Sequence, residues 1–260
     1  MEGWKSAMLK IEHTEVYGWE PAIRGMRNPM NSWDKSDSYF SCENCQGCYY
    51  ECEAQKREIP GMVDIWCDHT ALRIGTNDHD LMMRLAAGGA VHAKYRRMIT
   101  VYCDITAPLY WWKEFDTYKV GTVANSCSTM HKIHAKEFTL DDFSWEQLLN
   151  TGCDLFDVET DKGLFKRTVQ PLEFLCDYII PVLNTCREKY LKTKDKDYWW
   201  QMIQLLPTSY NQKRTIMMNY EVLVGMYRDR RNHKLDEWHT LCDWIRELPY
   251  SEIITGGEVG

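Results

Sequence analysis

The segment Ala107–His131, APLYWWKEFDTYKVGTVANSCSTMH, is denser in aromatic rings, hydroxyl groups and amides than an ordinary core segment. It follows Met98–Ile105, in which apolar and polar residues alternate, and that period of two predicts a half-buried strand. The Ala-Pro pair at the start of the segment ends the strand. Pro108 then suits the first turn of a helix that continues to Phe115.

The second part of this segment, Gly121–Met130, is small and polar. Its hydroxyl and amide groups can hydrogen-bond a phosphate or the edge of a heterocycle. A polar loop that caps the following helix is the alternative interpretation, and the residue types alone fit both.

Elsewhere, helical periodicity dominates the chain. Arg24 and Arg27 share one face of a short helix that begins near Pro21, and they form either a solvated face or an anion clamp. The other elements that we expect are a strand at Met8–Ile11 and helices at Asn77–Gly88, Leu172–Cys186 (interrupted by Pro181), Tyr198–Leu205, Ile216–Tyr227 and Leu235–Leu248.

Composition limits the possible classes of function. The chain has 260 residues, of which 44% are hydrophobic, so it can bury a substantial core. A net charge of −7 argues against a partner that is a nucleic-acid polymer or a membrane surface, because both require a basic field. The sequence shows no secretory leader and no apolar run of membrane-spanning length, so we expect a cytoplasmic protein.

Four cysteines lie within eleven residues, in the spacing C-x2-C-x2-C-x3-C: Cys42, Cys45, Cys48 and Cys52. This spacing is typical of an iron–sulfur cluster loop. Structural zinc is a second interpretation, with Cys67 or His69 as an additional ligand. A cysteine-rich surface insertion without metal is the third. The run lies in a segment, about 39–74, that we interpret as an insertion into a single domain covering residues 1–260.

Three common catalytic motifs are absent from the sequence. No G-x-G-x-x-G follows a strand, so a Rossmann nucleotide site is not indicated. There is also no G-x-x-x-x-G-K-[ST] loop and no G-x-S-x-G elbow, which argues against an ATPase and an α/β-hydrolase.

From Ala107 to Met130 the sequence resembles the flavin-dependent thymidylate synthases. That family has an Ala-Pro turn, a helix carrying Arg-Gln, and the signature R-H-R-x-x-S-x-N-E-x-S-x-R-Y. Lys113-Glu114 fall at the Arg-Gln pair and Thr117-Tyr118-Lys119 at R-H-R. Thr122 falls at the first serine, Asn125-Ser126 at Asn-Glu after a one-residue insertion, Ser128 at the second serine, and Met130-His131 at Arg-Tyr.

A second, separate region carries the same resemblance. The family has Leu-Pro, then N-A-R-S-L, an arginine eleven residues after that asparagine, and an A-Q-W-E segment. The matching positions here are Leu206-Pro207, Asn219–Leu223, Arg230 and, one residue late, Asp236-Glu-Trp238. His92 resembles the histidine that precedes the central strand in the family.

The resemblance implies an α+β fold, in which helices pack on an antiparallel sheet. It also implies a homotetrameric, FAD-dependent methyltransferase that acts at C5 of dUMP. Methylenetetrahydrofolate would supply the carbon and NADPH the electrons. By resemblance, Arg230 and Ser128 are the catalytic residues, and the nucleotide is bound by Lys113, Glu114, Ser126, Ser128 and Arg230. The flavin would contact His92, Thr117, Tyr118, Lys119, Asn125, Asn219 and His233.

The signature also departs from the family pattern. Only Lys119 is basic within it, with Lys113 just upstream, and lysine lacks the planar fork with which arginine holds phosphate. Two alternatives therefore stay open. One is a diverged flavoenzyme that modifies another pyrimidine nucleotide, and the other is a non-catalytic protein that binds a nucleotide or a metal on the same fold.

Overall fold

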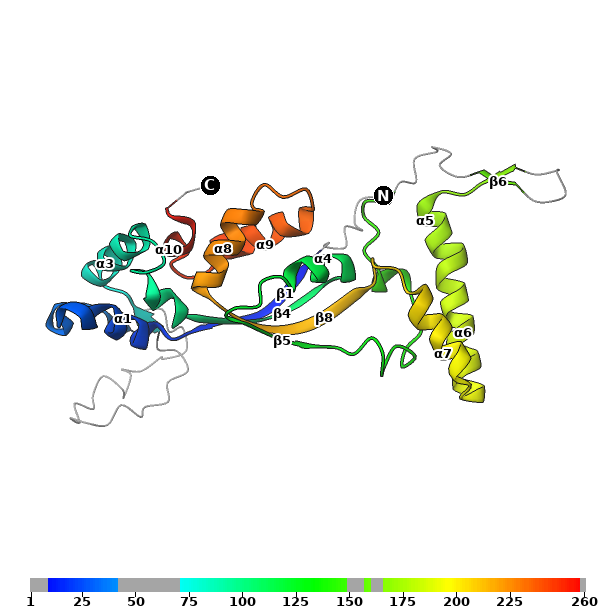
Figure 1. The fold of residues 1–260 in the computed structure, drawn as a ribbon, viewed down its shortest axis with the longest axis horizontal. Coiled ribbons are helices and arrows are strands. Elements are labelled where there is room, and N and C mark those ends of the chain that lie inside the picture. The colour runs from blue at the N-terminus through cyan, green and yellow to red at the C-terminus, as the bar shows by residue number, and fades with distance from the viewer. Residues whose placement is uncertain (1–8, 42–70, 149–156, 160–165, 258–260) are drawn as a thin grey trace, which may run out of the picture.

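The computed structural model describes residues 9–41, 71–148, 157–159 and 166–257. Within these ranges the central element is a four-stranded antiparallel sheet in the order β1-β4-β8-β5 (Figure 1). Its strands are β1 (Lys10–Tyr17), β4 (Thr100–Pro108), β8 (Asn211–Asn219) and β5 (Thr122–Ser126). The α+β class and the antiparallel sheet predicted from the sequence are thereby confirmed.

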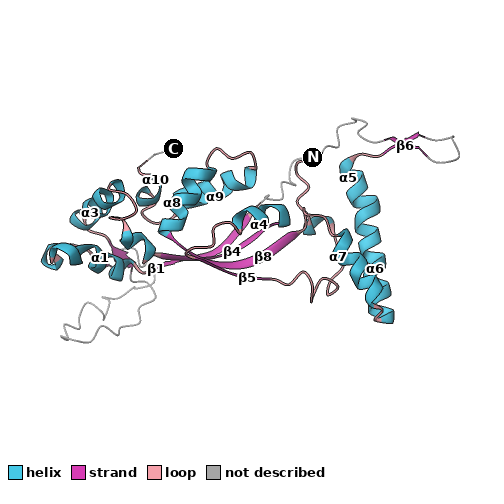
Figure 2. Ribbon diagram, in the orientation of Figure 1, coloured by secondary structure: helices cyan, strands magenta, loops and turns pink. Residues whose placement is uncertain are grey.

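The predicted alternation of Met98–Ile105 marks the central strand β4. Val101, Cys103 and Ile105 are buried, whereas Tyr102 between them is 41% exposed. One face of the sheet is therefore apolar. Figure 2 shows the helices α4 (Leu109–Phe115), α8 (Tyr220–Arg230) and α9 (Asp236–Glu247) together on one side of it. These helices supply the large rings of the main core, Trp111, Trp112, Phe115, Tyr220 and Trp238.

At one end of the sheet lie α1 (Trp19–Arg27), α3 (Thr76–Ala87) and α10 (Glu252–Thr255). A buried ion pair joins the first two, because Arg27 Nε donates to Asp78 Oδ1 at 2.6 Å. Arg27 is 4% exposed, so the interpretation of both arginines as a solvated face is wrong for Arg27. Arg24 is exposed and lies 3.6 Å from Glu20.

At the other end of the molecule a second apolar cluster forms around a helical hairpin (Figure 1). It contains α5 (Pro171–Phe174), a π-helical turn (Leu175–Ile179), α6 (Ile180–Thr193) and α7 (Lys196–Leu205). These helical segments follow one another without a break from Pro171 to Thr193, so Pro181, in the first turn of α6, does not interrupt the helix as predicted. None of the helices in the described ranges is both long and apolar enough to cross a membrane.

Two elements differ from the sequence expectation. The polar stretch Gly121–Met130 contains strand β5. Among the described strands it pairs only with β8, and it is mostly exposed, so its residues do not alternate between buried and exposed. Ile216 belongs to strand β8 rather than to a helix. The helix begins only at Tyr220, because the Asn219 side chain caps it by accepting from Val222 N at 3.0 Å.

The ends of the expected insertion are paired. Strand β2 (Tyr39–Ser41) runs antiparallel to β3 (Ala71–Arg73). The cysteine run Cys42–Cys52 lies outside the described residues, so its iron–sulfur or zinc interpretation stays a prediction. Within the described ranges no three histidine, cysteine or acidic side chains are grouped to hold a metal. A second short antiparallel pair is formed by β6 (Asp157–Glu159) and β7 (Lys166–Thr168).

Short 3-10 helices complete the fold. They cover Asn28–Met30, Trp33–Lys35, Lys94–Arg97 and Leu140–Asp142.

Candidate functional site

The carboxylate of Glu114, on α4, is the centre of a polar cluster beneath the end of α8. Its Oε2 atom accepts a hydrogen bond from Arg230 Nη1 at 2.9 Å and another from Trp238 Nε1 at 3.2 Å. His233 Nε2 lies 3.3 Å from the same oxygen. Residues from α4, α8, α9 and the α8–α9 turn are thus tied to one carboxylate oxygen.

Arg230 is held by rings as well as by charge. Its Nε donates to the Tyr118 hydroxyl at 2.9 Å. The guanidinium carbon lies 4.6 Å from the centre of the Trp238 ring and 5.5 Å from that of Tyr118. Stacking and two hydrogen bonds together fix the plane of the guanidinium. The Arg230 side chain is 18% exposed. Nη2 takes part in neither of these two hydrogen bonds.

His233 has its tautomer set by the backbone. Its Nδ1 accepts a hydrogen bond from Leu235 N at 3.2 Å, so Nδ1 carries no proton. In neutral His233 the proton therefore resides on Nε2, which faces Glu114. The edge of the imidazole that carries this proton therefore lies against the Glu114 carboxylate, within ion-pair distance of it.

The cluster brings together four residues that the sequence assigned to two different ligands. Glu114 and Arg230 were expected at the nucleotide, and Tyr118 and His233 at the flavin. In the structure Tyr118 contacts Arg230, and both Arg230 and His233 contact Glu114. Chemically, the arrangement is an oriented guanidinium backed by a carboxylate, which suits recognition of a planar anionic group.

Other predicted residues lie around this cluster without joining its hydrogen bonds. Thr117 is exposed just after α4, and its hydroxyl donates to the Glu114 carbonyl oxygen at 2.7 Å. Lys113 and Lys119 are exposed on either side of it. They are free to contribute positive charge to a ligand near the cluster.

The serines and the asparagine of the signature lie on or after the edge strand β5. Asn125 pairs with Thr215, and Ser126 pairs with Arg214. Ser128 follows the strand in an exposed turn, where its Oγ accepts from His131 N at 2.9 Å. None of the hydrogen bonds described for these residues reaches the Glu114 cluster, so the structure does not bring the expected serines and Arg230 into direct contact.

Asn219 and His92 occupy two further places. Asn219 uses its side-chain oxygen to cap α8, and its amide nitrogen packs against Gly121 so closely that an added Cβ would lie 2.7 Å from it. His92 lines a pocket of about 500 Å³ between α1 and α3. That pocket is mainly apolar, with Met26, Pro29 and Tyr95 among its walls.

Two side chains of the site region were missing from the sequence prediction. Trp238 was noted only as part of a motif, yet it both donates to Glu114 and stacks on Arg230. Arg214 stacks over Trp112 at 4.2 Å and pairs with Asp116 at 2.7 Å. Only the register of β8 against β5 reveals Arg214, because no sequence pattern distinguishes it from other strand residues.

Comparison with known proteins identifies the fold. No family model matches the sequence, and no curated protein matches it. Solved structures do match, and two of them are of flavin-dependent thymidylate synthase ThyX from Helicobacter pylori with FAD and dUMP. One aligns over 94% of this chain and 96% of its own at a TM-score of 0.56 and 15% identity. The other aligns over 94% and 95% at 0.57 and 13%.

The chain has the fold of the flavin-dependent thymidylate synthases. A UMP/dUMP methylase, PolB from Streptomyces cacaoi bound with 5-Br dUMP, aligns over 95% of each chain at 11% identity. Its TM-score of 0.47 is too low for a conclusion. At 15% identity or less, the two ThyX structures establish the fold of this chain and not the roles of its side chains.

Proposed function

We propose that the protein is a flavin-dependent enzyme that methylates C5 of dUMP, with methylenetetrahydrofolate as carbon donor and NADPH as reductant. The observation that carries this proposal is Arg230, held by Glu114, Tyr118 and Trp238 at the position where the family resemblance expects the catalytic arginine. The fold adds support, since both Helicobacter pylori structures that share it contain FAD and dUMP.

Arg230 has the chemistry that the pyrimidine requires. Substitution at C5 passes through a ring that carries negative charge, and a fixed guanidinium stabilises that charge as it develops. Because Nε and Nη1 are already engaged, little reorganisation is needed when the anion forms. Glu114 acts as a positioning residue, since it orients Arg230.

Phosphate binding falls to exposed residues of β5, of the turn that follows it and of α4. The hydroxyls of Ser126 and Ser128 and the ammonium group of Lys113 are all exposed and can donate to a nucleotide phosphate. In the described part of the chain, Ser128 Oγ is bonded to a backbone N–H and to no histidine or lysine base. We therefore assign Ser128 to binding rather than to covalent attack.

The proposed flavin site draws on residues near the cluster and on the separate pocket at His92. Lys119 and Thr117 provide an exposed cation and a hydroxyl, and the mainly apolar pocket at His92 has the volume expected of a site for a planar ring system. FAD, when bound, supplies hydride transfer. We assign its binding to His92, Thr117, Tyr118, Lys119, Asn125, Asn219 and His233.

A homotetramer is part of the proposal. The sheet face opposite the helices exposes Tyr17 (55%) and Tyr102 (41%), whose rings touch at 6.0 Å between centres. Exposed aromatic pairs of this kind are typical of surfaces that become buried on assembly.

The direct test is product formation. Purified protein is incubated with FAD, methylenetetrahydrofolate, NADPH and either dUMP or UMP, and the nucleotide is analysed by mass spectrometry. We expect a methylated deoxynucleotide from dUMP, and none from the variant Arg230→Ala. A methylated product from UMP alone would support the diverged-enzyme alternative. Folded, FAD-loaded protein that methylates neither would contradict a catalytic role.

A further inference from the structure

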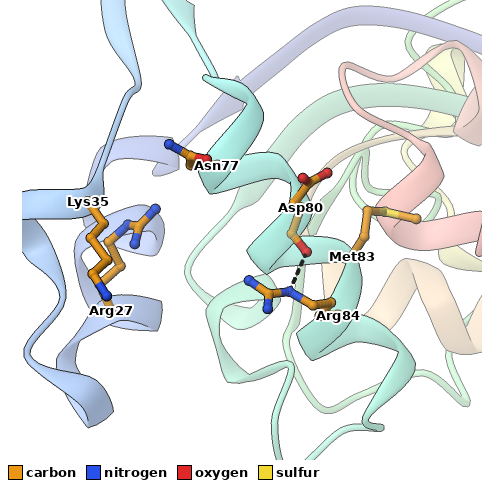
Figure 3. Close-up of a pocket in the computed structure, with 6 residues that line it drawn as sticks. All are labelled: Arg27, Lys35, Asn77, Asp80, Met83 and Arg84. Carbon is orange, nitrogen blue, oxygen red and sulfur yellow. Dashed lines mark hydrogen bonds between the residues drawn. The ribbon is translucent and has the colours of Figure 1, made fainter.

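A second pocket, of about 690 Å³, lies between α1, the 3-10 helix Trp33–Lys35 and α3. Figure 3 shows Arg27 and Lys35 on one side of it and the residues of α3 on the other. Three of the six residues that line it are cations and one is a carboxylate: Arg27, Lys35, Asn77, Asp80, Met83 and Arg84.

Arg27 is the buried cation of this pocket. Its Nε is bonded to Asp78, and its Nη1 donates to the Ser32 carbonyl oxygen at 3.2 Å. Its Nη2 is buried and has no hydrogen-bond partner. A buried donor without an acceptor costs free energy, and such groups are rare in native proteins. An acceptor on a bound ligand would remove this cost.

Asp78 cannot serve as that acceptor, because its oxygens are already occupied. Its Oδ2 accepts from the hydroxyls of Ser36 and Ser38, at 2.7 and 2.6 Å, and from the backbone N–H groups of Asp37 and Ser38. Burial alone would raise the pKa of Asp78, but these bonds and Arg27 outweigh it and hold the pKa below its usual value. The carboxylate is therefore a fixed anchor behind Arg27.

Two exposed cations face the same space. In Figure 3 the guanidinium group of Arg84 extends from α3 toward Arg27 and Lys35, and the Asp80 carboxylate lies on another side of the pocket. Arg84 Nε donates to the Asp80 carbonyl oxygen at 3.3 Å, which leaves the other nitrogens of its guanidinium to the pocket. Lys35 adds a flexible point charge at the rim.

We propose that this pocket binds the phosphate group of a small organic phosphate, at a place separate from the Glu114 cluster. Two guanidinium groups and an ammonium group surround one space. A phosphate ligand, with several oxygens and more than one negative charge, matches this set better than a carboxylate ligand does. Nη2 of Arg27 gains its missing acceptor. The volume admits a nucleotide as well as a smaller phosphorylated metabolite.

The test is isothermal titration of the full chain with pyrophosphate and, separately, with ADP. We expect saturable binding of one pyrophosphate per chain, weakened about tenfold in Lys35→Gln and in Arg84→Gln, because each removes one charge-assisted contact. Asp80→Asn should bind more tightly, since it removes the one carboxylate of the pocket. The matched control is Lys192→Gln, an exposed lysine on α6 at the opposite end of the molecule.

The two titrations distinguish a nucleotide site, a site for a simpler phosphate and the absence of a site. ADP binding that is tighter than pyrophosphate binding, and equally sensitive to Arg84→Gln, assigns the site to a nucleotide. Equal affinities assign it to a simpler phosphate. No saturable binding, or the same loss in Lys192→Gln as in Lys35→Gln, would overturn the proposal. Arg27 itself is left unchanged in these tests, because its removal would strand the buried charge of Asp78.

Discussion

Arg230 Nη1 and Glu114 Oε2 lie 2.9 Å apart, although 116 residues separate them in the chain. The contact joins the end of α8 to α4 across the buried face of the sheet. It also places two residues of separate sequence motifs at one point, which is where the proposed chemistry would be carried out. The first two predictions test this pair.

Glu114→Gln should weaken dUMP binding about tenfold, because a charge-assisted hydrogen bond contributes about 1.5–3 kcal/mol. Arg230 would keep its charge and lose its orientation. Isothermal titration with dUMP measures the effect. The control is Asp116→Asn, two residues away, which removes a carboxylate that pairs with Arg214 instead. Equal losses in both variants would mean that Glu114 has no special role.

Arg230→Lys should lower turnover by about a hundredfold or more, which corresponds to the loss of one oriented donor at a developing charge. Lysine keeps the positive charge, but it cannot bond to Tyr118 and Glu114 at once or stack flat on Trp238. Steady-state kinetics with dUMP would report the change. Unaltered turnover would show that charge alone is sufficient and that the cluster does not position Arg230 for catalysis.

Asp78→Asn should destabilise the protein by about 3–5 kcal/mol, because it leaves Arg27 charged, buried and without its ion-pair partner. Urea unfolding followed by circular dichroism measures the free energy of unfolding. Asp80→Asn, on the same helix but exposed, should change it by less than about 0.5 kcal/mol. Similar effects in the two variants would mean that the Arg27–Asp78 pair adds little to stability.

Acid should reveal the role of Asp104 on the open face of the sheet. Hydrogen bonds from Thr215 and Lys213, at 2.7 and 3.0 Å, lower the pKa of Asp104 from 3.8 to about 2. The folded state thus favours the ionised form. The stability that ionised Asp104 gives the folded state is fully present above 3.8, the ordinary pKa of an aspartate. It is lost as the pH falls toward about 2, the pKa of Asp104 in the folded protein.

The measurement for Asp104 compares urea midpoints of the wild type and Asp104→Asn between about pH 5 and pH 2. The wild type should be the more stable at the upper end, and the difference should shrink toward the lower end. Asp34→Asn, an exposed carboxylate in a 3-10 helix, is the control. A difference that stayed constant with pH would contradict the assignment.

The sequence predicted a strand correctly where only one face of that strand is buried. Strand β4 was predictable because only one of its faces enters the core, so its residues alternate. Strand β5 was not, since it lies at the edge of the sheet and most of its residues are exposed. Ile216 was placed in a helix because its spacing to Tyr220 and Leu223 fits a helical stripe, and only the Asn219 cap marks the true start.

The candidate site was only partly predictable. Motif spacing selected Glu114 and Arg230, but their pairing depends on how α8 crosses α4. The link from Arg27 to Asp78, and the pocket beside it, bring together residues 51 apart in sequence that no local pattern connects. Ser126, at the end of β5, and Ser128, in the turn after it, take no part in the Glu114 hydrogen bonds, and motif spacing alone does not show this.

The most direct test of the central claim is the absorbance spectrum of the purified protein, recorded before and after the addition of FAD and gel filtration. The account predicts flavin absorbance that stays with the protein, at one FAD per chain, and a spectral change when dUMP is added. Protein that is folded by circular dichroism but retains no flavin after incubation with FAD would contradict the account. It would leave a thymidylate synthase fold that serves binding rather than catalysis.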